Sequence, residues 1–586
     1  MKQKWTLLLE ETDRQLNTNH RKNTRIAIVR FALFLIMAWS FFNLVDGHQV
    51  WWFAMIPAFI LFMLAMDRHQ KNRKQEAFLK ARIRILQRLV DSLNDQWKKR
   101  ECDLSGLPED PVWQDLDLFS RQSLFQFLDM TTLPQGRETL VQYLTSVPSV
   151  EELKERQETV RCLLDHPDFL IEDWTYAHQL SDKERKALAS GNLEQVICPI
   201  PLPATEKIIR IMPVILILLF VLTLMHLLSP GVLISYFFVQ CALALFSMGS
   251  LQAGIGDLSV LRQGLQCSMD RLQALKQAQL TSPLLNRLNH LIRDEDGIFA
   301  NIAQIDRILD LFSVRANPFI SLPLQLLFLW DMQWAIQWNH IQEKTGSRWI
   351  TLMTLLGELE ALESLSMIGL THHKTCFPVF HEEVVLEFTD LIHPLILEQK
   401  AVGNSGALDH SITLVTGSNM SGKTTFMRTV GLNQVLAQAG GCVCGRTMTT
   451  SLFTILTSMK ITDNVNEGIS TFYQELLRIR GIMEALREEK PLLVLIDEIF
   501  KGTNSLDRIE GSKRIVRQLN RSSVRAMITT HDFELCDMEQ EDLSLVNIHF
   551  EEQYHEGKIS FDYRMKPGRC TQRNARYLMK MIGLDD

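Results

Sequence analysis

The sequence lacks several features that would assign it to a familiar class. Its ten cysteines are scattered, and the one close pair, Cys442 and Cys444, has the spacing of neither a zinc knuckle nor a C-x-x-C redox site. Charge of one sign is not in large excess, since 61 basic and 68 acidic residues leave a formal net charge of -7. No signal-peptide pattern of basic, apolar and small residues opens the chain. We therefore expect free thiols in a reducing compartment, no removable signal peptide, and DNA contact only through a local basic surface.

The chain does contain four long apolar runs, arranged in two pairs. The first pair covers residues 26–45 and 50–66 with DGHQ between them, and the second covers residues 211–228 and 232–251 with SPG between them. A helix needs roughly 17–25 residues to cross the hydrocarbon core. We therefore expect two transmembrane helical hairpins, one in an N-terminal region 1–68 and one in a region 206–254. Core helices of a soluble protein are the alternative for both, and the second hairpin could instead lie against a partner.

Basic residues flank both pairs in a way that predicts their orientation. RKNTR precedes the first pair, DRHQKNRK follows it, and Lys207 and Arg210 precede the second pair. Lys and Arg are retained on the cytoplasmic side of membrane proteins. Trp51 and Trp52 open the second run, where an indole can sit at the level of the lipid headgroups. The sequence thus predicts a multi-pass protein of the cell membrane that contacts the lipid bilayer and keeps both termini in the cytoplasm.

A fifth apolar stretch, residues 318–338, differs from the other four. It contains polar side chains that would be costly in lipid, and we expect a buried helix here instead of a further span. The polar residues concerned are Gln325, Asp331, Gln333 and Gln337.

The other regions before residue 375 have helical patterns. Residues 69–100 place apolar residues at helical spacing with Lys and Arg elsewhere, which predicts a stalk helix whose basic face is either only solvated or contacts anionic lipid or DNA. We expect region 69–205 to hold this stalk and the first part of a helical core, and region 255–374 to hold the long helices of a lever. Short apolar strands and turn residues begin near residue 375, so we expect a separate domain over residues 375–586.

A phosphate-binding pattern lies near the start of this last domain. Residues 411–416 are β-rich, GSNMSGKTT follows, and the next residues have helical periodicity, which is the context in which G-x-x-x-x-G-K-[ST] binds phosphate. We expect Lys423 to reach the β- and γ-phosphates and Thr424 to ligate Mg²⁺. The sequence thus predicts ATP and Mg²⁺ as cofactors, held by Gly417, Ser418, Asn419, Met420, Ser421, Gly422, Lys423, Thr424 and Thr425.

Two further apolar strands end in polar side chains. PLLVLIDE ends in Asp497, which we expect to hold Mg²⁺, and Glu498, which we expect to polarise the attacking water. The strand AMITT runs into His531, which lies where ligands bind in α/β sheets and is predicted to sense the γ-phosphate or orient water. A solvated acidic turn and an incidental histidine are the alternatives for these residues taken singly.

These motifs resemble those of the ATPase domain of the MutS family of DNA mismatch-repair proteins. TGSNMSGKTT is similar to the family's loop, EGISTFYQEL to its STF signature, DEIFKGTNSLD to its DEIGRGTS motif and TTHDFEL to its TTH motif. The similarity runs from about residue 393 to the end, and a weaker one at residues 123–160 is to the start of the family's helical core. The resemblance implies a homodimer with composite sites. Ser470 would then approach the γ-phosphate of the partner as a catalytic residue, and Thr503 and Asp507 would line the interface and help to bind the nucleotide.

Two functions remain open at this point. The first is a membrane-anchored MutS-like ATPase that acts as an ATP-dependent dimeric clamp on DNA. It would lack the family's mismatch-reading domain. In this it resembles the membrane-associated branch of the family. The second is an ATP-driven membrane scaffold or remodelling protein without DNA. An ABC-type transporter is disfavoured, because no LSGGQ-type signature precedes Leu493 and the short hairpin loops leave little for a translocation path. The expected fold class is mixed: α-helical transmembrane hairpins and a helical core with a lever, plus a C-terminal α/β P-loop ATPase domain of the ABC-like type.

Overall fold

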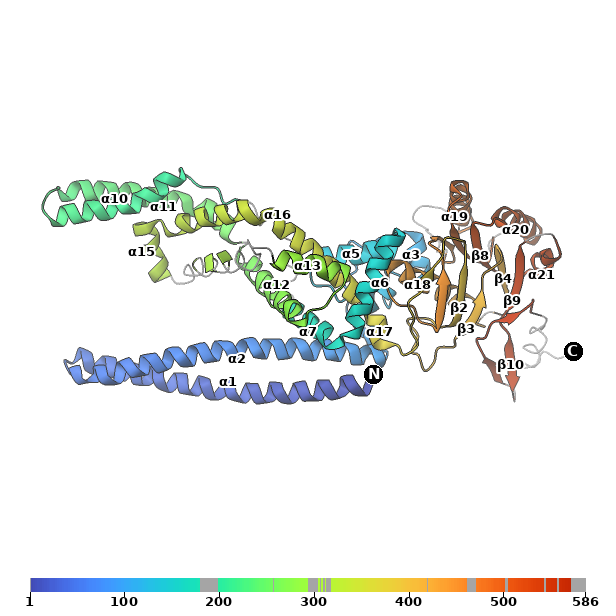
Figure 1. Ribbon diagram of the computed structural model, residues 1–586, viewed down its shortest axis with the longest axis horizontal. Coiled ribbons are helices and arrows are strands. Elements are labelled where there is room, and N and C mark those ends of the chain that lie inside the picture. Colours follow the sequence, from blue (N-terminus) through green and yellow to red (C-terminus); the bar gives the residue numbers. More distant parts are fainter. Residues whose placement is uncertain are drawn as a thin grey trace.

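A computed structural model of the protein describes residues 2–179, 199–256, 258–293, 304–305, 307–308, 311, 318–418, 420–460, 471–500, 504–541, 544–555 and 558–570. The molecule is elongated, with two helical hairpins at one end, a helical body in the middle and an α/β region at the other end (Figure 1). Helices predominate in the described residues, and the two larger sheets belong to the C-terminal region. The expected sequence of helical hairpins, helical body and C-terminal α/β region is therefore present.

The first hairpin consists of α1 (Lys2–Val45) and α2 (Trp52–Leu93), which are joined through a 3-10 turn, η1 (Gln49–Trp51). Both helices extend far beyond the apolar runs that the sequence marks. The second run begins later than expected as α-helix, because residues 50–51 belong to the turn. Helix α2 continues without interruption from its apolar half into its basic half, which covers residues 69–93 of the predicted stalk.

Polar contacts hold the two helices of this hairpin together on the side away from the turn. The Asn19 Nδ2 donates to the Asn72 carbonyl oxygen at 3.0 Å, and the Asn23 Nδ2 donates to Glu76 Oε2 at 2.6 Å. Toward the turn, most large apolar side chains of both helices are exposed. Helix α1 and the segment Gln49–Leu93 are each long and apolar enough to cross a membrane.

The second hairpin consists of α10 (Glu206–Leu224) and α11 (Pro230–Gly256). Helix α10 begins before the predicted span and ends four residues before its predicted end at residue 228. The Tyr236 hydroxyl of α11 donates to the Met212 carbonyl oxygen of α10 at 3.1 Å. Helix α10 is long and apolar enough to cross a membrane, whereas the apolar part of α11 within the described residues, Pro230–Phe246, is shorter.

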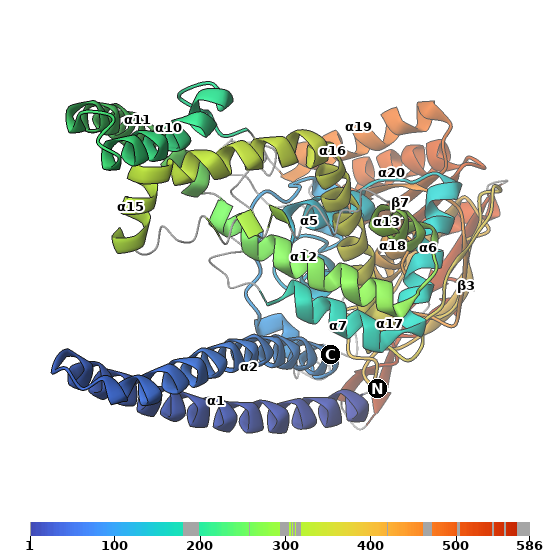
Figure 2. The same ribbon diagram turned by 60° about the vertical axis from the view of Figure 1, so that its left-hand side comes forward.

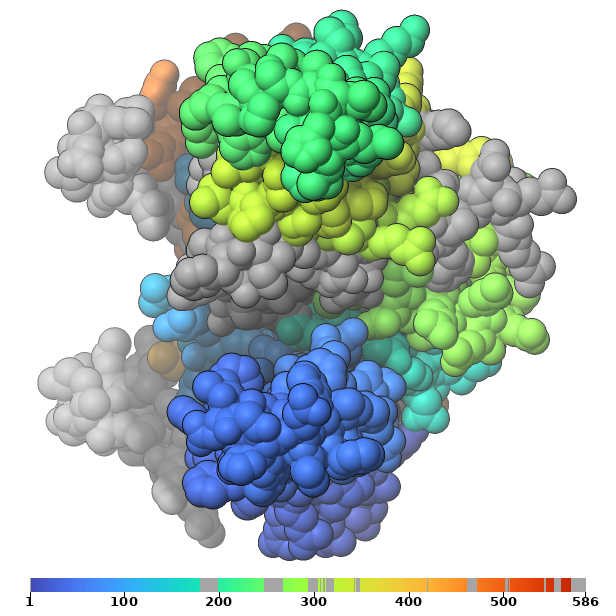
Figure 3. Space-filling view, turned by 90° about the vertical axis from the view of Figure 1, so that its left-hand side faces the viewer, coloured from blue at the N-terminus to red at the C-terminus, as the bar shows by residue number. Residues whose placement is uncertain are grey.

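Both hairpins project from the helical body in the same direction. Their turns lie at the same end of the long axis, opposite the α/β region (Figure 1). The view onto the turns shows the two hairpins as separate masses of atoms, blue for α1 and α2 and green for α10 and α11 (Figure 3). A flat layer perpendicular to the long axis would therefore meet both hairpins at once.

The helical body connects the hairpins to the α/β region. Its longest helix, α16, runs from beside the second hairpin to the α/β region, and α7, α12 and α13 pack beneath it (Figures 1 and 2). The helices of the body are α3 (Pro111–Asp115), α4 (Leu124–Leu128), α5 (Pro134–Thr145), α6 (Val150–Asp165), α7 (Pro167–Ala177), α12 (Leu258–Ala278), α13 (Pro283–Arg293), α15 (Pro318–Phe328), α16 (Trp330–Leu365) and α17 (Met367–Thr371).

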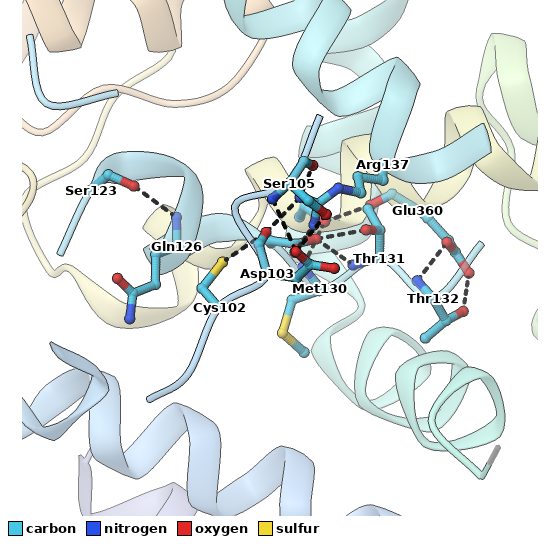
Figure 4. Close-up of polar contacts among 12 residues, drawn as sticks. Cys102, Asp103, Ser105, Ser123, Gln126, Met130, Thr131, Thr132, Arg137 and Glu360 are labelled. Carbon is cyan, nitrogen blue, oxygen red and sulfur yellow. Dashed lines mark hydrogen bonds and ion pairs between the residues drawn. The ribbon is translucent and has the colours of Figure 1, made fainter. Parts of the chain in front are cut away.

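A carboxylate of α16 caps the first turn of α5. Glu360 Oε2 accepts from the backbone N–H groups of Thr132, at 2.9 Å, and Leu133, at 2.8 Å, and Glu360 Oε1 accepts from the Thr132 hydroxyl at 2.6 Å (Figure 4). A negative charge at this end of a helix is stabilised by the unpaired N–H groups and the helix dipole. Glu360 Oε1 also lies 2.7 Å from Arg271 Nη1, so α12 contacts the same carboxylate. Helices α5, α12 and α16 therefore share one buried polar contact.

The expectation of one buried helix over residues 318–338 is wrong. The stretch forms two helices, α15 and α16, because Leu329 adopts a left-handed backbone conformation with φ of 51°. Gln325 and Asp331 are buried as expected, but Leu322, Leu327 and Phe328 are exposed. In α15, Gln325 thus faces the protein while Leu322, Leu327 and Phe328 face outward.

The α/β region contains a six-stranded sheet in the order β12-β9-β4-β8-β7-β6 and a four-stranded sheet in the order β1-β5-β2-β3. Strands β9, β4, β8, β7 and β6 are parallel, and β12 is antiparallel to β9. The elements are β1 (Val379–Phe380), β2 (Leu386–Leu391), β3 (Asn404–Ala407), β4 (Ile412–Thr416), α18 (Lys423–Ala439), β5 (Thr447–Thr450), β6 (Thr454–Ser458), α19 (Thr471–Ala485), β7 (Leu492–Asp497), α20 (Ser505–Leu519), β8 (Val524–Thr529), α21 (Phe533–Cys536), β9 (Leu545–His549), β10 (Glu552–His555), β11 (Lys558–Phe561) and β12 (Lys566–Pro567).

Helices cover both faces of the six-stranded sheet. Apolar side chains of α19 and α20 pack on one face in a core of their own. Helix α18 covers the other face, and its core is continuous with that of the helical body. Near-continuous apolar strands are typical of parallel sheets that are buried on both faces. This packing places the loop between β4 and α18 at the carboxyl edge of the sheet.

The nine cysteines within the described residues form no disulfide bond. Cys442 and Cys444 are buried beside the four-stranded sheet, and burial raises the pKa of the Cys442 thiol to about 12. A thiol with so high a pKa stays protonated and unreactive near neutral pH.

Candidate functional site

The loop between β4 and α18 has the backbone geometry that a phosphate-binding turn requires. Gly417 has φ of 142° and Gly422 has φ of 103°, a region that side chains disfavour. A Cβ atom on Gly417 would lie 2.4 Å from the Phe550 carbonyl oxygen, so this position has no room for a side chain. The Ser421 hydroxyl donates to the Ser418 carbonyl oxygen at 2.9 Å and fixes the turn. The loop therefore curls tightly over the first turn of α18.

Lys423 begins α18 and extends its side chain into this loop. The side chain is 5% exposed, and its Nζ donates to the carbonyl oxygens of Gly417, at 2.7 Å, and Ser418, at 2.8 Å. A buried ammonium group and the N-terminus of a helix together produce a positive potential at one point. That is the arrangement by which proteins bind phosphate.

Asp497 ends β7 on the next-but-one strand and faces the same point. Its Oδ1 accepts from the Thr424 hydroxyl at 3.2 Å and from the Thr529 hydroxyl at 2.7 Å. Two hard oxygen ligands, Thr424 Oγ1 and Asp497 Oδ1, are thus adjacent. Mg²⁺ is bound in many proteins by one or two such groups together with phosphate oxygens and water. Within the described ranges no group of three or more His, Cys, Asp or Glu side chains forms a self-sufficient metal site, so the residues present fit Mg²⁺ only in company with a phosphate ligand.

The structure brings Glu498 and His531 into contact. Glu498 Oε1 lies 3.1 Å from His531 Nε2, although the two residues follow different strands. Glu498 has φ of 60°, and its backbone N–H donates to the Thr529 hydroxyl at 2.9 Å. A strained backbone at a chain reversal is held in place here by Thr529, which also binds Asp497. The sequence patterns did not identify Thr529, and its place at the end of a strand was the only signal for it.

A further carboxylate, that of Glu475, stabilises the turn after β7 that contains Glu498. Glu475 of α19 is buried and accepts the backbone N–H of Phe500, which also has a left-handed conformation. Arg508 of α20 forms a two-pronged ion pair with Asp532, the residue after His531, at 2.8 and 3.0 Å. The segments that carry Glu498 and His531 are therefore each anchored by a neighbouring helix.

Eight of the predicted site residues line one cavity of about 730 Å³, a size that holds a cofactor: Ser418, Met420, Gly422, Lys423, Thr424, Thr425, Asp497 and Glu498. Gly417, Ser421 and His531 do not line it. Asp507 is exposed on α20 and does not line this cavity. Asn419, Ser470 and Thr503 fall outside the described residues. The lining residues are His393, Ile396, Lys400, Ala401, Val402, Asn404, Ser418, Met420, Gly422, Lys423, Thr424, Thr425, Phe426, Thr429, Asp497, Glu498, Phe550 and Tyr563.

Several lining residues belong to segments that carry none of the predicted side chains. His393 and Lys400 lie in the connection between β2 and β3, and Tyr563 follows β11. Burial, aided by the nearby charge of Arg428, lowers the pKa of His393 to about 4. Its Nδ1 accepts the backbone N–H of Leu395 at 3.2 Å, so the neutral ring is held in one orientation. The sequence motifs did not predict a role in the site for any of these three residues.

The helical body is fastened to the α/β region by one buried aspartate. The carboxylate of Asp115 in α3 accepts from the Thr457 hydroxyl at 2.8 Å, the backbone N–H groups of Met459 and Lys460 at 2.9 Å, and Arg478 at 2.6 Å. The four donors satisfy the hydrogen-bonding capacity of this buried carboxylate. The strand β6 and the helix α19 are thereby tied to the body.

Comparisons with known proteins agree with the sequence motifs. Residues 413–585 match the family model of MutS domain V. The DNA mismatch repair protein MutS of Streptococcus pyogenes serotype M5 (strain Manfredo) is 28% identical over 241 residues, which are 40% of this chain and 28% of that protein. The DNA mismatch repair protein MutS of Macrococcus caseolyticus (strain JCSC5402) is 29% identical over 234 residues, which are 39% of this chain and 27% of that protein. The match thus spans little more than a quarter of the length of these curated relatives. The C-terminal region of the chain is therefore similar to domain V of MutS proteins.

Proposed function

We propose that the protein is a membrane-anchored MutS-like ATPase whose region 375–586 is a P-loop domain of the ABC-like type. The observation that carries the proposal is the convergence of a phosphate-binding loop, two metal-binding oxygens and an acid–base pair on one cavity. Lys423, Thr424, Asp497 and Glu498 line this cavity, and His531 contacts Glu498. Each of these side chains is of the type that ATP hydrolysis requires at that place.

The roles follow from the contacts. Lys423 is positioned to bind the β- and γ-phosphates, and the backbone N–H groups of the loop add donors around them. Thr424 and Asp497 would hold Mg²⁺, which neutralises the charge that develops on the phosphates. Glu498 is placed to accept a proton from water, and His531 orients its carboxylate through the contact of 3.1 Å.

We propose a homodimer in which the two nucleotide cavities face each other. Two large apolar side chains of the α/β region are strongly exposed: Met420, which lines the cavity, is 84% exposed, and Leu506 of α20 is 75% exposed. A second copy would cover them. Ser470, Thr503 and Asp507 would then belong to the interface, as the resemblance to the MutS family implies.

We propose that both hairpins insert into the cell membrane from the cytoplasmic side. Their exposed apolar surfaces and common direction support this, because a surface of this kind is stable in lipid and unstable in water (Figure 1). The α/β region lies at the other end of the molecule, where cytoplasmic ATP would reach it. The hairpin and body boundaries at residues 68, 205, 254 and 374 remain proposals of the same kind.

DNA is the proposed partner because the matched relatives are named as DNA mismatch repair proteins. We propose that ATP binding closes the dimer as a clamp on DNA near the membrane. The second candidate, an ATP-driven membrane scaffold or remodelling protein, is favoured by the two hairpins and by the net charge of -7. In either function, the long helices between the cavity and the hairpins would transmit movement from one to the other.

The test measures ATP hydrolysis and DNA binding by the detergent-purified protein at one near-physiological salt concentration, because phosphate contacts make affinity strongly salt-dependent. Lys423→Ala should lose nucleotide binding and hydrolysis, while Lys490→Ala, an exposed lysine far from the loop in sequence, should keep both. Hydrolysis by Lys423→Ala at the normal rate would contradict the proposed site. ATP-dependent binding to matched, mismatched or branched duplexes would establish the clamp, and hydrolysis without any DNA binding would establish the second candidate.

A further inference from the structure

Helix α15 has an inverted distribution of polar and apolar side chains. Leu322, Leu327 and Phe328 are 48%, 41% and 40% exposed, whereas Gln325 on the same helix is 3% exposed. Asp331, two residues after the break at Leu329, is 4% exposed. A helix on a water-facing surface would show the opposite distribution. The exposed face of α15 is therefore suited to an apolar medium.

The direction of α15 differs from that of the hairpins. Helices α1, α2, α10 and α11 run along the long axis of the molecule, while α15 runs across it (Figure 1). The second view, turned about the vertical axis, again shows α15 directed across the first hairpin (Figure 2). If the hairpins stand upright in a bilayer, α15 lies in the plane of that bilayer.

Hydrogen bonds fix the level of α15 along the second hairpin. The side chain of Gln240 in α11 donates to the carbonyl oxygens of Leu326 and Leu327 at 3.0 and 2.8 Å. The side chain of Gln333, just after the break, donates to the carbonyl oxygen of Ile209 in α10 at 2.8 Å.

That level corresponds to the edge of the apolar part of the hairpin. Ile209 lies between Lys207 and Arg210, the two cations at the start of α10. Cations at the end of an apolar helix lie at the cytoplasmic boundary of a bilayer. The end of α15 thus meets the hairpin where the hydrocarbon gives way to headgroups.

Two tryptophans lie at the same level. Trp330 and Trp334 begin α16, one helical turn apart, and their rings meet edge to face with centroids 5.6 Å apart. Both are only partly buried. Tryptophan is enriched at membrane–water boundaries because its ring is apolar and its N–H polar. The aromatic pair and the cations of α10 therefore indicate the same boundary.

We propose that α15 is a membrane-surface helix that lies in the cytoplasmic leaflet, with Leu322, Leu327 and Phe328 inserted among the lipid chains. The inference rests on the membrane anchoring proposed above and adds a contact that neither hairpin makes. The view onto the hairpin turns shows atoms of α15 and the start of α16 directly against those of α10 and α11 (Figure 3). Apolar side chains inserted 5–10 Å below the headgroups are typical of helices that lie in the boundary.

The test places a photoreactive benzophenone amino acid at single positions of the full-length protein in phospholipid vesicles and measures covalent attachment of lipid. Phe34, an exposed residue of α1 in the apolar run, is the positive control, and Val379 of β1, exposed in the α/β region, is the negative control. We expect Leu322 and Phe328 to attach lipid about tenfold more than Val379 does, at a yield similar to that of Phe34.

The outcomes distinguish the two proposals. Lipid attachment at Phe34 without attachment at Leu322 and Phe328 would overturn the surface helix and leave the membrane anchoring intact. Failure of attachment at Phe34 itself would overturn the anchoring and the surface helix together. A second readout, Leu322→Ser with Phe328→Ser, should reduce recovery of the protein in the vesicle fraction only slightly, because the hairpins remain, and a complete loss of recovery would contradict the assigned roles.

Discussion

Asp497 and Glu498 are adjacent in sequence but are held by different contacts. The sequence predicted that one would bind metal and the other would activate water, and the structure adds Thr529 as the residue that fixes both. Its hydroxyl donates to Asp497 and accepts from the backbone N–H of Glu498. A sequence motif identifies side chains by their spacing along one strand. It does not identify a hydroxyl on the neighbouring strand, because β7 and β8 are paired only in the folded sheet.

The contact between Glu498 and His531 gives the first prediction. Glu498→Gln keeps the shape of the side chain but removes its ability to accept a proton. We expect ATP binding to persist while hydrolysis falls by about 10² to 10⁴, the usual contribution of a general base. The measurement is steady-state ATPase activity together with nucleotide affinity. Glu534→Gln, at an exposed glutamate of α21, is the matched control, and an unchanged rate in Glu498→Gln would contradict the assignment.

The buried His393 gives a prediction on pH. Its pKa is about 4 in the folded protein, below the ordinary value of 6.5, so the unfolded chain binds more protons between pH 6.5 and pH 4. The free energy of unfolding should therefore be unaffected by this group above pH 6.5 and should fall as pH falls through that window, by about 3 kcal/mol at the most. His393→Asn, which retains an acceptor for the Leu395 N–H, should show a smaller loss of thermal unfolding midpoint between pH 7 and pH 5. An equal loss in both proteins would rule out this role.

Among the elements, the contact of α5 with α16 depends on two glycines. Gly136 lies against the Glu360 side chain, and a Cβ atom on Gly357 would lie 2.9 Å from the backbone carbon of Gln135 and from the Gly136 nitrogen. Backbone atoms cannot move aside as a flexible side chain can. The close approach is what allows Glu360 to reach the first turn of α5.

The glycine contact gives the third prediction. Gly357→Ala should force α5 and α16 apart and destabilise the protein by about 1–3 kcal/mol, the usual cost of overpacking. Gly481→Ala is the matched control, because Gly481 lies inside α19 with nothing within 4 Å of the added methyl group. It should be neutral or stabilising by about 0.5–1 kcal/mol. The measurement is the thermal unfolding midpoint of both variants, and equal midpoints would contradict the tight packing.

Some helices and strands could be predicted from the sequence and others could not, depending on which sequence pattern indicated them. Strand β4, its loop and α18 could be predicted, because the motif, the strand and the helix have separate signatures that agree. The break at Leu329 could not, since leucine is an ordinary helix former and its left-handed conformation is set by tertiary contacts. The extent of α1 and α2 was also missed. Hydropathy marks where a helix is apolar and gives no sign of where the helix itself ends.

At the scale of the whole molecule, one hydrophobic core extends from the base of the first hairpin to the helix that follows the phosphate-binding loop. It includes Trp5 of α1, Trp97 after α2, and Met427 of α18. The order of the regions along the chain was predictable from composition. Their joining was not, because residues far apart in sequence meet there, as Asp115 meets Arg478.

The fourth prediction concerns the whole chain. If both hairpins span the bilayer, the protein should stay in the membrane fraction after washing with high salt and with alkaline buffer, and only detergent should release it. Peripheral attachment through the basic half of α2 would instead be released by salt, because surface electrostatic contacts are screened. The measurement is the fraction of full-length protein in the sediment after each wash. Release by salt would contradict the spanning hairpins.

Helix α16 spans 36 residues from Trp330 to Leu365, which corresponds to a length of about 54 Å. One end is fixed to α5 by Glu360, and the other lies beside the second hairpin. The helix bends along its course and is not a straight rod (Figure 2). Because displacement grows with distance from a pivot, a small tilt at the α5 end would still move the hairpin end of α16 further than it moves the residues near Glu360.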